Sequence, residues 1–175
     1  GMISLRVVLV AACIAPLVAC GSDDSSSTDT SLVPTDLSVE GLTAFLEEER
    51  YRQTGWTPES EAPRPQESGS PHSTVRVWLN DVTVAAQAED PENLPVDSMA
   101  VKELFEGDTL VGIATVLKTT EGESPNTWLY YCYGPAGRCS NNDPEATKEE
   151  PIYGRGLDVS CGYCHSGIIT SLTPR

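Results

Sequence analysis

The five residues Cys161-Gly162-Tyr163-Cys164-His165 constrain this chain more than any other stretch. Two thiols three positions apart, followed directly by an imidazole, form the pattern at which a c-type haem is attached. In that chemistry the thiols add to the vinyl groups of the porphyrin, and the imidazole binds the iron as its proximal ligand. The sequence therefore predicts covalent haem c as the cofactor, held by Cys161 and Cys164 and ligated by His165.

Two other interpretations of these residues remain open. A zinc site would use Cys132 and Cys139 together with Cys161 and either Cys164 or His165, although the wide spacing of the first pair and an oxidising compartment disfavour it. A redox-active Cys-x-x-Cys pair would need a thioredoxin-like βαβ context, which the residue pattern does not indicate.

The N-terminus predicts export. Within residues 3–19 one arginine precedes an apolar stretch that is too short for a comfortable transmembrane helix. The stretch closes with Leu17-Val18-Ala19-Cys20-Gly21, which resembles the cleavage box of bacterial lipoproteins, and an ordinary secretory signal or a membrane anchor is the alternative. We expect residues 1–19 to be a signal peptide, with Gly1 foreign to the chain that starts at Met2, and Cys20 to be lipidated.

The expected domain organisation follows from composition. Residues 20–37 are mostly polar and acidic, which predicts a flexible tether. Residues 38–175 are enough for one haem domain with its own core. We expect the mature protein outside the cytoplasm, in the periplasm or on the cell surface, and anchored to the lipid bilayer through Cys20.

Charge and cysteine content narrow the partners further. The formal net charge of −15 leaves no basic patch, so nucleic acid is not expected as a partner, whereas a basic redox partner protein would suit this surface. Among the six cysteines, Cys13 leaves with the signal peptide. Since free thiols are rare in exported proteins, Cys132 and Cys139 are expected to form a disulfide that contributes about 2–3 kcal/mol.

Hydrophobic periodicity predicts an α+β fold. An amphipathic helix is expected over residues 38–53, with Ser38 as its cap and Gly55 near its end. Short strands with little room for crossover helices favour an antiparallel β-sheet with flanking helices on one side, and a C-terminal helix from Asp158 that carries the haem-attachment residues. The strands are expected at residues 74–80, 98–105, 110–118 and 127–133, a short helical run at 82–88, and irregular chain at 57–71 and 140–156.

Together with the attachment pattern, the string Met99-Ala100-Val101-Lys102-Glu103-Leu104 resembles the cytochrome P-460 family and its relative cytochrome c′-beta. The resemblance extends over residues 50 to 167 approximately. It implies a mono-haem protein that oxidises hydroxylamine, or binds or processes nitric oxide, at a five-coordinate iron, and it implies a homodimer. It also implies that Lys102 is bonded through its nitrogen to the porphyrin edge, which requires a close, desolvated and deprotonated amine. A solvated lysine on a strand is the alternative.

The residues that would face the open side of the iron leave the reaction undecided. Family members that oxidise hydroxylamine carry a carboxylate there as a proton acceptor. Ala114 takes this position in the present chain and cannot accept a proton, although Glu103 or Asp108 could still approach. Hydroxylamine oxidation is therefore in doubt, while binding of nitric oxide or another small diatomic is not.

Two further side chains could act as a sixth ligand and so convert the protein into an electron carrier. Met99 is more plausible as a core residue, because residues 99 and 102 point to opposite faces of a regular strand. His72 is interpreted as a loop residue, with ligation of the iron as the less favoured alternative. Five aromatic residues are expected to fill the core and line the pocket: Trp78, Trp128, Tyr130, Tyr131 and Tyr133.

Overall fold

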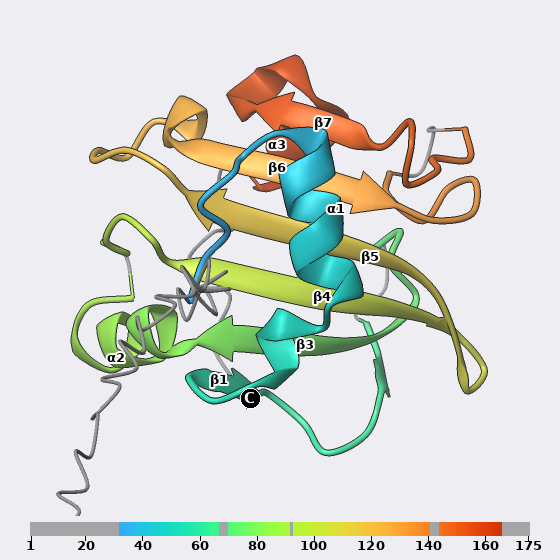
Figure 1. The fold of residues 1–175 in the computed structure, drawn as a ribbon, viewed down its shortest axis with the longest axis horizontal. Helices are drawn as coiled ribbons and strands as arrows, with labels where there is room; N and C mark the ends of the chain where they lie inside the picture. The colour runs from blue at the N-terminus through green and yellow to red at the C-terminus, as the bar shows by residue number, and fades with distance from the viewer. Residues whose placement is uncertain (1–31, 67–69, 92, 141–143, 166–175) are drawn as a thin grey trace, which may run out of the picture.

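An antiparallel sheet organises the chain in the computed structural model, which describes residues 32–66, 70–91, 93–140 and 144–165. Within these residues the sheet has seven strands in the order β1-β3-β4-β5-β6-β7, and β2 pairs with β3 (Figure 1). All the strand pairings are antiparallel, so the predicted sheet is confirmed. The strands are β1 (Trp56–Pro58), β2 (Arg64–Pro65), β3 (Thr74–Asn80), β4 (Met99–Glu106), β5 (Thr109–Lys118), β6 (Trp128–Tyr133) and β7 (Ile152–Arg155).

The four long central strands form within about one residue of the predicted limits, including residues 98–105, whose pattern was compatible with a strand or a helix. On β3, the side chains of Val75, Val77 and Leu79 are buried in one cluster, which confirms that they share a face. The helix α2 (Asp81–Glu89) follows β3 directly, close to the predicted helical run. The side chain of Asn80 caps α2 by accepting a hydrogen bond from the Thr83 amide at 3.1 Å.

The helices cover both faces of the sheet, so the expectation that they lie on one side is wrong. The helix α1 (Val39–Glu47) packs Leu42, Phe45 and Leu46 against Met99 and Val101 of β4, and Figure 1 shows α1 lying across the strands. The helix α3 (Ser160–His165) contributes Cys161 to the clusters on the opposite side. We call these two sides the α1 face and the α3 face. Because side chains alternate along a strand, Ala100, Lys102 and Leu104 lie on the α3 face.

The first helix is shorter than predicted. Ser38 caps it as expected, accepting a hydrogen bond from the Gly41 amide at 3.1 Å, but α1 ends at Glu47. Glu49 has a φ of 51°, which breaks the helix, and a 3₁₀ turn η1 (Arg50–Arg52) follows. The break turns Tyr51 into the core, where it is only 1% exposed. A tertiary contact therefore overrides the local preference for a longer helix.

The structure places the start of the packed chain before the expected residue 38. Leu32, Val33 and Leu37 pack against the α1-face core, and the hydroxyl of Tyr153 on β7 donates a hydrogen bond to the Leu37 carbonyl at 2.7 Å. The predicted signal peptide and the lipidated Cys20 lie outside the described residues. None of the helices in the part of the chain that the structure describes is long and apolar enough to cross a membrane.

Candidate functional site

The backbone of the short helix α3 packs closely against the turn that precedes it. The chain leaves β7, passes through the 3₁₀ turn η3 (Gly156–Asp158), and enters α3. A β-carbon on Gly162 would lie 1.7 Å from the carbonyl oxygen of Gly156, so a side chain does not fit between the two cysteines at this position. The Gly162 amide also donates to the Val159 carbonyl at 3.0 Å. The glycine in the attachment pattern thus lets the helix sit directly on the preceding turn.

Docking of α3 brings two of the expected haem-binding residues onto the α3 face. Cys161 packs against two buried clusters there, one that includes Cys132 and one that includes Tyr130. The His165 ring lies 6.1 Å from the Tyr130 ring, centre to centre, with 29° between their planes. The side chain of Cys164 lies outside the described residues.

His165 is held as a neutral imidazole. Burial is the main cause that lowers the pKa of His165, to about 4, and the positive charge of Lys102 lowers it further. A neutral imidazole has a lone pair on one nitrogen, which is the form that binds a metal ion. The site therefore presents His165 in the protonation state that a proximal ligand needs.

Lys102 lies on the same face, in the middle of the sheet. In the strand register it stands opposite Val77 of β3 and Ala114 of β5. Burial lowers the pKa of Lys102 to about 8, and the charge of Arg64 lowers it as well, while Glu59 and Cys161 raise it. Lys102 is thus desolvated and close to losing its proton near neutral pH, as a nucleophilic amine must be.

Two cysteines close a loop beside this face. Cys132 and Cys139 are joined by a disulfide, with 5.8 Å between their α-carbons, as the sequence predicts. Disulfide sulfurs are not thiolates, so the zinc site that would use all four cysteines is not supported. No group of three or more His, Cys, Asp or Glu side chains in the described ranges is arranged to hold a metal ion.

Glu103 and Met99 lie on the α1 face, away from α3. Glu103 is fully buried and accepts hydrogen bonds from the hydroxyl of Tyr51 at 2.9 Å and from Nε of Arg52 at 2.7 Å. The expectation that Glu103 could approach an iron held by α3 is therefore wrong, because the sheet lies between them. Met99 is fully buried in the α1-face core, which agrees with its interpretation as a core residue.

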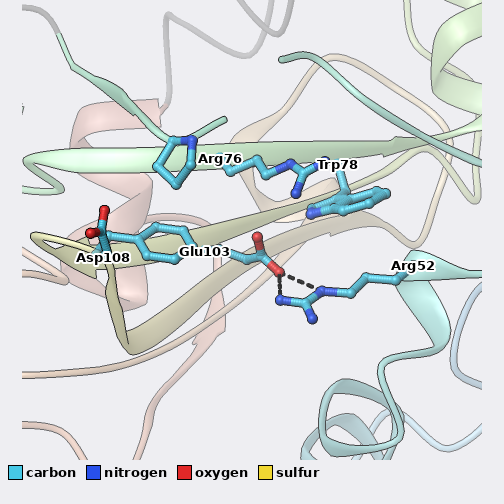
Figure 2. A pocket seen from close by; sticks show the side chains of 7 residues that line it. Arg52, Arg76, Trp78, Glu103 and Asp108 are labelled. Atoms are coloured by element: carbon cyan, nitrogen blue, oxygen red, sulfur yellow. Dashed lines mark hydrogen bonds and ion pairs between the residues drawn. The ribbon is translucent and has the colours of Figure 1, made fainter. Parts of the chain in front are cut away.

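An open groove of about 410 Å³ lies on the α1 face near Glu103. Figure 2 shows Glu103 turned toward Arg52, with Trp78 and Arg76 beside it. The guanidinium of Arg76 lies over the Trp78 ring at 4.5 Å. Among the described residues, Oε2 of Glu103 and the indole nitrogen of Trp78 have no hydrogen-bond partner. Asp108 lines this groove as well, so it also belongs to this side of the molecule.

His72 lies beside His165 on the α3 face and is buried, although the sequence predicted an ordinary loop residue. It is 7% exposed, and its ring lies 6.4 Å from the His165 ring, centre to centre. Burial lowers the pKa of His72 to about 3, assisted by the charges of Lys102 and His165. Strand alternation gave no signal for His72, because β3 begins at Thr74 and the row of Val75, Val77 and Leu79 does not continue to residue 72. A single histidine next to Pro71 is more often a surface loop residue.

The residues described here fit a covalent haem in their chemistry. They supply a cysteine and a neutral imidazole on one helix, apolar strand residues such as Ala114 opposite, and a desolvated amine on the same face. Comparison of the chain with models of known protein families, with curated proteins and with solved structures found no match.

Proposed function

We propose that this chain is an extracytoplasmic, mono-haem c-type cytochrome of the P-460 type. The observation that carries the proposal is the position of His165, a half-buried neutral imidazole on the same helix as Cys161 and on the face that also holds Lys102. The proposal includes export, anchoring to the bilayer through Cys20, and association as a homodimer.

Each residue has a defined task in this proposal. Cys161 and Cys164 hold the porphyrin by adding their S–H groups across its vinyl double bonds, which forms thioether bonds without an external oxidant. His165 binds the iron through its neutral imidazole. Bound haem supplies an iron that changes oxidation state and accepts small ligands. The C-terminal helix α3 is then the haem-attachment helix.

Lys102 is the candidate for a third covalent link. Its nitrogen would replace a hydrogen on the porphyrin edge, a change that removes two electrons and two protons. An oxidant such as hydrogen peroxide is therefore required. The lowered pKa of Lys102 supports this role, because the neutral amine is the nucleophile.

Two functions are candidates for the haem iron: binding of small nitrogen species, and transfer of electrons. Small nitrogen species, hydroxylamine or nitric oxide, would bind if the side of the iron opposite His165 is open. Ala114 on the α3 face favours nitric oxide over hydroxylamine, because no carboxylate stands at that position and Glu103 points to the other face. A saturated iron would instead pass electrons to a redox partner protein, and the buried His72 favours this second candidate.

The test is to mature the chain in cells that export it and attach haem, and to measure its intact mass and optical spectrum. We expect a mass increased by one haem and a c-type spectrum, and loss of both in the Cys161→Ala, Cys164→Ala double variant. A Lys102 link would make the haem-loaded protein lighter by the mass of two hydrogens. Lys102→Arg should abolish this difference. A wild-type chain without haem, from cells that load a control c-type cytochrome, would refute the proposal.

A further inference from the structure

His72 is held in a defined position inside the molecule. It precedes β3, and the next residue, Ser73, has a φ of 57°. Residues other than glycine rarely adopt this backbone conformation, which costs roughly 1–2 kcal/mol. The turn is secured by a hydrogen bond from the Gln66 amide to the Ser73 carbonyl at 2.7 Å. The packing therefore stabilises a strained turn, and this turn places the His72 imidazole beside His165 on the α3 face.

The hydrogen bond of His72 fixes which ring nitrogen carries the proton. Nδ1 of His72 lies 2.7 Å from the carbonyl oxygen of Arg138. A carbonyl oxygen only accepts hydrogen bonds, so Nδ1 is the donor and Nε2 keeps a lone pair. Metal-binding histidines are characteristically oriented in this way, with the second nitrogen donating to a carbonyl or carboxylate.

The spacing of the two histidine rings fits a shared metal ion. An imidazole nitrogen binds a transition metal at about 2 Å and lies roughly 1.2 Å from the centre of its ring, so two rings on opposite sides of one ion have centres about 6.3 Å apart. The His72 and His165 rings are 6.4 Å apart, with 26° between their planes.

The other candidate ligands compare poorly with His72. Met99 and Glu103 lie on the α1 face. His72 is the candidate whose ring stands next to the ring of His165.

We propose that His72 is the second axial ligand of the haem iron, bound through Nε2 on the side opposite His165. This inference rests on the proposed covalent haem and selects the second of its two candidate functions, the transfer of electrons. With His72 bound, the resting iron would be six-coordinate. Nitric oxide or another small ligand then has to displace His72 before it can bind.

The test uses the mature, haem-loaded protein and variants of His72. We expect wild type to be low-spin by optical and electron paramagnetic resonance spectroscopy, with the near-infrared signature of two imidazole ligands. His72→Ala should become high-spin, should return to low spin when imidazole is added, and should bind imidazole at least tenfold more tightly than wild type, because no ligand has to be displaced.

Two further variants separate ligation from folding. His72→Met keeps a ligand at this position and should give the spectrum and the raised reduction potential of histidine–methionine ligation. Met99→Leu is the matched control and should leave the wild-type spectrum unchanged. A high-spin wild-type protein, or a low-spin spectrum that survives in both His72 variants, would overturn the inference while leaving the haem proposal intact. A chain without covalent haem would overturn both.

Discussion

Lys102 and Glu103 are neighbours on β4, yet they serve opposite faces of the sheet. Lys102 lies on the α3 face, where its charge acts on His72 and His165. Glu103 lies on the α1 face and accepts hydrogen bonds from Tyr51 and Arg52. One strand therefore supplies a desolvated amine to the candidate site and a structural carboxylate to the core.

The buried amine makes stability depend on pH in protein without haem. The unfolded chain binds the Lys102 proton below the ordinary pKa of about 10.4, whereas the folded chain binds it only below about 8. Between these values the unfolded state holds more protons, so the free energy of unfolding rises with pH.

Lys102→Met should accordingly stabilise the haem-free protein at pH 7 by an amount on the order of 2–3 kcal/mol, and the gain should vanish above pH 10.5. Urea denaturation of both proteins across this range measures it. A constant difference between the two proteins would show that Lys102 is not the group that titrates. The charged and titratable groups that act on Lys102 or share its face are Glu59, Arg64, Cys161, His72 and His165.

Removal of the Glu103 carboxylate should destabilise the fold. Glu103→Ala leaves the buried hydroxyl of Tyr51 without its acceptor and Arg52 without its partner, and we expect a loss of about 2–4 kcal/mol in the free energy of unfolding. Glu106→Ala is the matched control on the same strand, because Glu106 is exposed and its ion pair with Arg138 should contribute less than about 1 kcal/mol. Equal losses in chemical denaturation would contradict the structural role of Glu103.

The disulfide should contribute to stability and to the position of His72. The Cys132→Ser, Cys139→Ser double variant should lose about 2–3 kcal/mol, measured by denaturation. Arg138 lies inside the closed loop, and its carbonyl bonds to His72. The variant should therefore also increase the rate of backbone amide hydrogen exchange at His72 and its neighbours. Unchanged exchange at the turn before β3 would mean that the loop keeps its conformation without the bond.

Gly162 should be essential for the attachment helix. Gly162→Ala puts a methyl group onto the carbonyl of Gly156, so α3 has to shift. We expect haem loading to fall several-fold, measured by intact mass, although both cysteines and His165 remain. Gly107→Ala is a suitable control, because a β-carbon there meets nothing within 4 Å and only the strained φ of 58° is affected. Full loading of Gly162→Ala would show that the close packing is not needed.

The central strands could be predicted from sequence because their periodicity records burial directly. Val75, Val77 and Leu79 occupy alternate positions, and the strand they form has the predicted limits. The C-terminal helix was expected from Asp158, and α3 begins at Ser160. In both cases the information is local.

The errors concern features that depend on distant segments. The break at Glu49 follows from packing of Tyr51 against the sheet, which helical periodicity alone does not record. The strand β7 has four residues, including Gly154, and forms because β6 offers it an edge. The burial of His72 depends on Arg138, whose carbonyl lies 66 positions further along the chain.

The loop closed by Cys132 and Cys139 has a consequence for how the protein matures. Oxidation of two thiols fixes the carbonyl of Arg138, and that carbonyl fixes the tautomer of His72. We therefore expect the α3 face to be held most firmly where thiols are oxidised. A chain folded under reducing conditions would lack this restraint, so the geometry of the site depends on where the chain is folded.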